Sequence, residues 1–438
     1  MNSEEVEKKD VMQADESQNK HVSVYTIDFP TNSELRKKLN RPAVVAIGYL
    51  IVTTWSAYST ASATALVAGG LNVFFWGLLI TVFCIICAAA SLAEPASLCP
   101  YGNQAQWCSI LTPNKMIATA NIASLIWNVC GFLLISIFML VQSRGHYNSA
   151  KTAFITISNQ SGWSTSFVPW VSGLSQAALS TTAFDAVAHL AYEMHEPHKD
   201  VPFGMLSAIG TNGIIGLLYA VIFIFCLPAN AFDLLTTPTG FPFGQFLLNL
   251  THGSQVGTVF LILVFFIPLL FTGVDLYVTT SRIACGFASQ GGLPNLVGKV
   301  NQRIDAPIFA FIFVGIINVC LAWIYVGSTA AFTAFISAPA VVLGWTYSAV
   351  AASMLFYGRP VKQIKTKFNL GSILGPFANI VTIIFYLCLT VFLSLPPTYP
   401  VSASSMNFTS VILVASILAP ILTWFLYAKR FYRPIVTD

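Results

Sequence analysis

Ionisable side chains stand inside segments of this chain that are otherwise apolar. Asp185, His189 and Glu193 follow one another at intervals of four residues. On an α-helix each interval advances about 40°, so the three side chains would share one stripe. Ionisable groups are costly in a bilayer, and they mark a pathway for a substrate or an ion. A carboxylate and an imidazole on one stripe could also exchange a proton, because an imidazole changes charge near physiological pH.

Two further acidic residues lie in or beside other apolar stretches. Glu94 stands where one stretch ends, and Asp275 lies within another, seven residues before Arg282. On an α-helix that spacing puts Asp275 and Arg282 on nearly the same face, two turns apart. A buried aspartate is expensive unless it is hydrated or paired. Asp275 therefore has two interpretations, a contact for a substrate ammonium group or a pairing between helices through a hydroxyl group or His189.

Hydroxyl-bearing residues are concentrated in the first apolar stretch. Thr53, Thr54 and Ser56 flank Trp55, and further serines and threonines continue to position 64. Small polar residues of this kind are common where two membrane helices pack closely. From the residues alone, such helix packing is the expected interpretation, and a polar site within the bilayer is the alternative. A second group of hydroxyl-bearing residues ends at Thr182.

The whole chain has the composition of a polytopic membrane protein. Of its 438 residues, 55% are hydrophobic and only 9% are charged. Its apolar runs repeatedly reach about 20 residues, the length that an α-helix needs to cross the hydrocarbon core. We therefore predict an all-α protein with ten spans in the lipid bilayer. The candidate spans lie near residues 43–68, 72–97, 119–142, 166–192, 204–228, 256–281, 306–326, 330–356, 373–395 and 409–428.

Basic residues predict how these spans are oriented. With a cytoplasmic N-terminus, 19 of the 21 Lys and Arg residues fall on the cytoplasmic side, as the positive-inside rule expects. The same orientation puts all three Asn-x-Ser/Thr sequons, which are candidate glycosylation sites, in non-cytoplasmic loops. These sequons begin at Asn159, Asn249 and Asn407. We expect a disordered cytoplasmic tail over residues 1–40, a transmembrane domain over 41–430 and a short cytoplasmic tail over 431–438.

The sequence predicts neither a cofactor nor a nucleic-acid partner. Its nine cysteines lie within the spans or at their ends, without a paired pattern, so neither a disulfide framework nor a metal site is expected. The basic flanks of the spans account for the net charge of +4. Phosphate-binding loops and similar enzyme motifs are missing from the sequence, and we expect that the chain is not an enzyme.

Six motifs, in order along the chain, resemble one known family. They are Gly48-Tyr49 with Thr53-Thr54-Trp55, Ser91-Leu92-Ala93-Glu94, Asn159-Gln160-Ser161-Gly162-Trp163, Asp185 to Glu193, Ser281-Arg282 with Gly291-Gly292-Leu293-Pro294, and Leu395-Pro396-Pro397. Over residues 43–430 the chain resembles the fungal GABA, choline and amino-acid permeases of the amino acid–polyamine–organocation superfamily. The resemblance implies a LeuT-like inverted-repeat fold of 12 spans. It also implies secondary active transport of a small amine-bearing solute by alternating access, at the plasma membrane and with protons as a candidate coupling ion.

The resemblance also indicates that part of the first repeat is missing. Three candidate spans precede Asp185, where the family has five. The third and fourth spans of the family are the ones without a counterpart, and the gap falls near residues 109–120. In the family the third span lines the substrate site. The alternative is therefore a truncated paralogue or a mis-spliced product that does not transport.

The resemblance assigns roles to the candidate residues. The family breaks its first helix near the hydroxyl-rich segment, which implies that Thr53, Thr54, Trp55 and Ser56 line the substrate site through freed backbone N–H groups and side chains. Near the break of the family's sixth helix, Asp185 would attract a substrate ammonium, next to Thr182 and with Phe184 and Trp55 supplying apolar or cation–π contact. Coupling or gating roles, as alternatives to structural ones, fall to Glu94, His189, Glu193 and Arg282. Glu94 and Arg282 could pair near the cytoplasmic gate.

Overall fold

The computed structural model describes most of the transmembrane part of the chain. The described residues are 41–60, 66, 70–98, 114–157, 159, 161–194, 196–228, 233–234, 237, 241–289, 291–299, 307–327, 329–356, 368–396, 398–401 and 406–431. The predicted tail over residues 1–40, nearly all of the predicted tail over 431–438 and residues 109–113 of the predicted gap lie outside this description.

Long apolar segments fold as helices, because a helix satisfies its own backbone N–H and C=O groups without water. The α-helices are α2 (Arg41–Val52), α3 (Thr54–Thr60), α5 (Leu78–Leu98), α6 (Asn114–Gln142), α7 (Ala150–Phe154), α8 (Phe167–Thr181), α9 (Pro197–Cys226), α10 (Pro242–Leu250), α11 (Gln255–Ser289), α12 (Ile308–Gly327), α13 (Thr329–Phe356), α14 (Gly371–Leu393), α15 (Thr409–Thr423) and α16 (Lys429–Phe431). A 3-10 helix, η2, spans Phe184–Glu193, and short π-helices, η1 and η5, span Val73–Gly77 and Trp424–Ala428. The described residues contain no β-strand.

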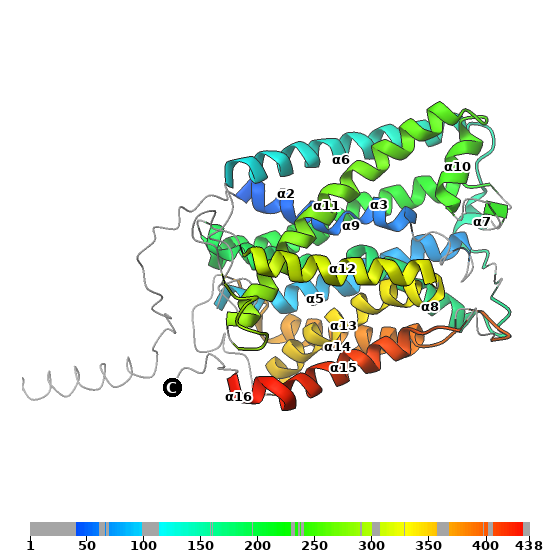
Figure 1. Ribbon diagram of the computed structural model, residues 1–438. Coiled ribbons are helices and arrows are strands. Elements are labelled where there is room, and N and C mark those ends of the chain that lie inside the picture. The colour runs from blue at the N-terminus through cyan, green and yellow to red at the C-terminus, as the bar shows by residue number, and fades with distance from the viewer. Residues whose placement is uncertain are drawn as a thin grey trace, which may run out of the picture. The chain divides into compact units, whose positions relative to one another are not determined.

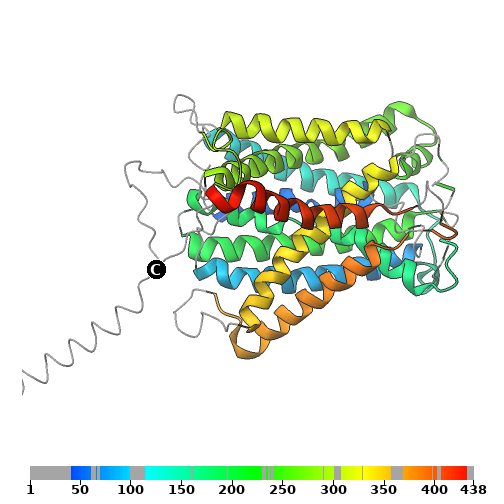
Figure 2. The ribbon, with the colours of Figure 1, turned by 60° about the horizontal axis from the view of Figure 1, so that its bottom comes forward.

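The helical membrane fold predicted from composition is confirmed. Within the described residues, eight helical segments are long and apolar enough to cross a bilayer: 41–59, 73–93, 124–142, 197–226, 255–289, 338–356, 371–393 and 409–427. α12 adds a shorter apolar helix over 308–324. Most of the long helices run along one common direction, with α7 and α10 at one end of the bundle and α16 at the opposite end (Figures 1 and 2).

The candidate span near 166–192 is not a continuous helix. α8 ends at Thr181, Thr182 is extended with ψ 168°, and η2 begins two residues later. Ala183 between them has a φ of 69°, in the left-handed region that non-glycine residues rarely adopt. The break implied by the resemblance is therefore present at Thr182–Ala183.

The prediction that Asp185, His189 and Glu193 share one stripe is wrong. All three lie in η2, which is a 3-10 helix rather than an α-helix. A 3-10 helix has three residues per turn, so a spacing of four residues advances by about 120° instead of about 40°. Along the backbone of η2, a step of four residues therefore does not return to the same face.

The first apolar stretch is broken as well. α2 ends at Val52 and α3 begins at Thr54, with Thr53 between them at a φ of 35°.

A glycine allows α2 to approach η2 and α9 closely. A Cβ on Gly48 would lie 2.8 Å from a methyl group of Val187 and 2.9 Å from Ala208. α2 therefore packs closely against η2 and α9, the elements that follow the second break.

Candidate functional site

Side chains of other helices fill the break between α2 and α3. Thr272, on α11, places its hydroxyl oxygen 2.8 Å from the carbonyl oxygen of Leu50 and 3.0 Å from the hydroxyl oxygen of Thr53. Both threonines are buried. Because the left-handed Thr53 interrupts the helix, these hydroxyls replace part of the ordinary backbone hydrogen bonding.

The amide of Asn212, on α9, bridges the same break. Its Oδ1 accepts a hydrogen bond from the backbone N–H of Thr54 at 3.1 Å. Its Nδ2 donates to the carbonyl oxygen of Tyr49 at 3.0 Å and to that of Ala208 at 2.9 Å. One buried side chain therefore joins the end of α2 to the start of α3. The N–H group of Thr54, which was expected to be free for a substrate, is occupied by protein.

A second buried amide, Asn128 on α6, holds two aromatic side chains of the broken helix. Its Oδ1 accepts hydrogen bonds from the indole N–H of Trp55 at 2.7 Å and from the hydroxyl of Tyr49 at 3.0 Å. The Trp55 ring also contacts those of Tyr219 and Phe265, with centroids 5.6 and 5.8 Å away. Trp55 therefore belongs to a different hydrophobic cluster from Phe184, the aromatic residue with which it was expected to act.

At the second break, a tyrosine from α13 holds Asp185. The hydroxyl of Tyr347 donates to Oδ1 of Asp185 at 2.6 Å. The Tyr347 ring lies 5.1 Å from that of Phe184 and 5.8 Å from that of Tyr386, measured between centroids. The half-buried Asp185 carboxylate is thus held by a tyrosine whose ring contacts two further aromatic rings. Such a combination suits an organic cation, because the carboxylate supplies charge and the ring faces are electron-rich.

The remaining predicted residues lie near the two breaks or on α11. Thr182 donates a hydrogen bond to the Ala178 carbonyl of the preceding helix α8, and Ser56 is fully buried. Asp275 and Arg282 share α11, as their spacing predicted, with Asp275 half-buried and Arg282 buried. The side chains of three predicted gating residues lie outside the described part. These are Glu94, His189 and Glu193.

Sequence reasoning missed Asn128, Asn212, Thr272 and Tyr347. The two asparagines carried a usable signal, because an amide in an apolar helix needs hydrogen-bond partners. Tyr347 carried none, since it is 162 positions from Asp185 and tyrosines are common in membrane helices. No group of three or more His, Cys, Asp and Glu residues in the described part is arranged to hold a metal ion.

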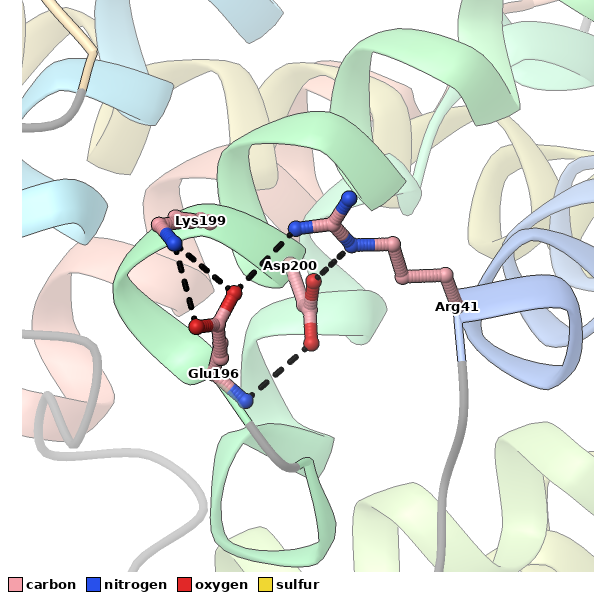
Figure 3. Close-up of polar contacts among 4 residues, drawn as sticks. All are labelled: Arg41, Glu196, Lys199 and Asp200. Atoms are coloured by element: carbon pink, nitrogen blue, oxygen red, sulfur yellow. Dashed lines mark hydrogen bonds and ion pairs between the residues drawn. The ribbon is translucent and has the colours of Figure 1, made fainter.

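An ion-paired cluster joins the first residue of α2 to the start of α9 (Figure 3). The Arg41 guanidinium contacts Asp200 at 2.7 Å and Glu196 at 3.3 Å, and Lys199 contacts Glu196 at 2.9 Å. The Asp200 side chain is only 3% exposed, whereas those of Arg41 and Glu196 are more than half exposed. Asp200 also accepts from the backbone N–H of Glu196 at 3.2 Å, near the N-terminus of α9, where negative charge is favoured.

Because the two cations of this cluster contact carboxylates of different burial, we expect their replacement to lower thermal stability by different amounts. Arg41→Gln removes the cation next to the buried carboxylate of Asp200, whereas Lys199→Gln removes one from the exposed carboxylate of Glu196. Exposed ion pairs contribute little to stability. We expect Arg41→Gln to lower the apparent melting temperature in detergent clearly more than Lys199→Gln, measured by the loss of monodisperse protein on heating. Equal shifts in the two variants would contradict this assignment.

A family model described as amino acid permease matches residues 105–417. The chain is 22% identical over 473 residues to the choline transporter of Saccharomyces cerevisiae, covering 92% of this chain and 83% of the relative. It is 29% identical over 337 residues to the polyamine transporter TPO5 of the same yeast, covering 74% and 53%. It is 27% identical over 325 residues to the amino-acid permease BAT1 homolog of Oryza sativa subsp. japonica, covering 71% and 61%.

Proposed function

The chain belongs to the amino acid permease family, and from this membership we propose that it carries a small amine-bearing solute across a membrane by secondary active transport with alternating access. The observation that carries the proposal is the Asp185 carboxylate at the second helix break, which accepts a hydrogen bond from Tyr347, whose ring contacts that of Phe184. Two of the relatives are a choline transporter and a polyamine transporter. Both names agree with a site for an organic cation.

In this proposal the substrate ammonium contacts Asp185 and the neighbouring aromatic rings. Asp275 on α11 provides a second negative charge within the membrane part of the chain. The hydroxyl-bearing residues at the two breaks complete the polar lining: Thr53, Thr54, Ser56 and Thr182. Trp55 stabilises the first break through its hydrogen bond to Asn128.

Alternating access requires contacts that form in one state and separate in another. We assign such a role to the Arg41–Asp200 contact, because it joins α2, which precedes one break, to α9, which follows the other. Glu94, Arg282 and Glu193 remain proposed gating groups. His189 remains the proposed proton carrier, since an imidazole titrates near physiological pH.

We further propose that the chain lies in the plasma membrane with both termini in the cytoplasm, and that it lacks the third and fourth spans of its family. The alignment with the yeast choline transporter supports a gap. It runs over 473 residues, more than the 438 that the chain contains, so some positions of the relative have no counterpart here. The chain also spans only 53% of the polyamine transporter and 61% of the rice permease homolog.

Uptake by whole cells tests the proposal. The full chain is expressed in yeast lacking its own amine permeases, and entry of labelled choline, GABA and a polyamine is followed at several concentrations. We expect saturable uptake of at least one of them. An unlabelled competing amine should raise the apparent half-saturation concentration. Uptake no greater than that of cells with an empty vector, for all three amines and with the chain at the cell surface, would refute the proposal.

A further inference from the structure

We propose that Asn249 is the only one of the three sequon asparagines that carries an N-linked glycan, and that Asn159 and Asn407 serve as structural caps instead. All three lie in segments between candidate spans that the charge distribution places outside the cell. In Figure 1, α7, which precedes Asn159, and α10, which contains Asn249, lie at the same end of the bundle, opposite α16. What separates the three asparagines is how their side-chain amides are used.

Asn249 presents a side-chain amide that is available for modification. It lies in the last turn of α10 and is exposed. Its Oδ1 accepts a hydrogen bond from Gln245 at 2.9 Å, on the exposed surface of the same helix. Within the described residues its Nδ2 donates no hydrogen bond. A glycan on Nδ2 would therefore extend into solvent without breaking a contact of the fold.

Asn407 uses its entire amide to join two helices. Its Nδ2 donates one hydrogen bond to the carbonyl oxygen of Leu393 at 2.6 Å and another to that of Leu395 at 3.0 Å, at the end of α14. Its Oδ1 accepts from the backbone N–H of Thr409, the first residue of α15, at 3.0 Å. A glycosylated asparagine keeps only one N–H on Nδ2. The fold therefore cannot keep both of these donor bonds and carry a glycan at Asn407.

Asn159 closes a turn that packs against another loop. Its Oδ1 accepts from the backbone N–H of Ser161 at 3.0 Å and from the hydroxyl of Ser161 at 2.6 Å, while its Nδ2 donates to the carbonyl of Trp163 at 3.0 Å. The backbone N–H of Tyr399 then donates to the Ser161 carbonyl at 2.7 Å. Both polar atoms of the partly buried Asn159 side chain are thus used within this turn, whereas the exposed Asn249 uses only its Oδ1.

The modification itself needs an activated sugar donor. Nδ2 of Asn249 would attack C1 of an oligosaccharide carried on a lipid diphosphate. The new N–C bond forms as the C1–O bond to the diphosphate breaks, the diphosphate leaves with the bonding electrons, and the amide nitrogen loses one proton. No oxidation or reduction is involved. The hydroxyl of the sequon, at Thr251, is required for recognition of the acceptor.

Gel mobility before and after treatment with an N-glycan-removing amidase tests the proposal on the full chain expressed in yeast. We expect one mobility step in the wild type, retained in Asn159→Gln and Asn407→Gln and lost in Asn249→Gln. A matched pair at the third sequon position gives an independent check. Thr251→Ser keeps the hydroxyl and should keep the step, whereas the isosteric Thr251→Val should lose it.

A separate heating experiment tests the role of Asn407. Asn407→Gln should lower the apparent melting temperature in detergent, while Asn249→Gln should not. A wild-type chain without a mobility step, or a step that persists in Asn249→Gln, would overturn the proposal. Because neither experiment measures transport, a failure here leaves the proposed transport activity to be judged on its own test.

Discussion

Replacing Asp185 with asparagine is expected to raise the half-saturation constant for amine uptake by about 10- to 150-fold. The substitution keeps the size of the side chain and much of its hydrogen bonding but removes the negative charge. A hydrogen bond to a charged group contributes about 1.5–3 kcal/mol, which corresponds to that range of affinity. Uptake curves at equal surface expression give the measurement.

Two other variants separate charge from geometry at this site. Tyr347→Phe removes the hydroxyl that donates to Asp185 at 2.6 Å but keeps the ring, so its effect should be smaller than that of Asp185→Asn. Glu193→Gln, at the far end of η2 and near the predicted cytoplasmic interface, should also have a much smaller effect. An unchanged half-saturation constant in Asp185→Asn, or a larger effect of Glu193→Gln, would remove Asp185 from the substrate site.

Replacing Asn212 with leucine should weaken the first helix break itself. The N–H group of Thr54 would lose its acceptor, and the carbonyl of Tyr49 would lose one of its donors. A buried polar group left without a partner costs about 1–3 kcal/mol. A free-energy cost of this size lowers the equilibrium ratio of the intact break to the opened break by about 5- to 150-fold. We expect a lower melting temperature in detergent and a reduced maximal rate of uptake.

A neighbouring residue on the same helix supplies the control for Asn212. Thr211 is exposed, and its hydroxyl bonds to the Ser207 carbonyl of its own helix at 2.6 Å. Thr211→Ala should therefore leave both the melting temperature and the maximal rate of uptake close to their wild-type values. If Asn212→Leu behaved like Thr211→Ala in both measurements, the amide bridge across the break would be unimportant.

Apolar length and composition were enough to predict the helical membrane fold. About 20 apolar residues in succession have few structural alternatives. The resemblance added the two breaks, at Thr53 and at Thr182–Ala183, and both are present. Periodicity was less reliable next to a break. The four-residue spacing after Asp185 suggested one stripe, but the segment that follows a left-handed residue folds as a 3-10 helix.

The partners of the break residues could not be predicted, because they come from distant helices. Tyr347 reaches Asp185 across 162 positions, and Asn212 reaches Thr54 across 158. The spacing of residues within one segment carries no information on such contacts. Burial of an isolated amide is the one local signal, and it indicates that a partner exists without identifying it.

If the chain lacks the third and fourth spans, the family resemblance suggests that transport fails, because the third span of the family lines the substrate site. The contacts at the breaks support the opposite expectation. α9 and α11 supply Asn212 and Thr272 to the first break, α6 supplies Asn128, and α13 supplies Tyr347 to the second. All four of these helices are present in the described part of the chain. We therefore expect the site to form in the chain as it stands.

Counterflow in liposomes tests the central claim most directly, because it needs only the chain and a bilayer. The purified chain is reconstituted into vesicles loaded with unlabelled choline, GABA or a polyamine, and entry of the labelled compound is followed. We predict transient accumulation of at least one labelled amine, and a weaker response at the same concentration with Asp185→Asn. Vesicles that contain folded chain yet accumulate no more label than empty vesicles, for every amine tested, would contradict the assignment as a transporter.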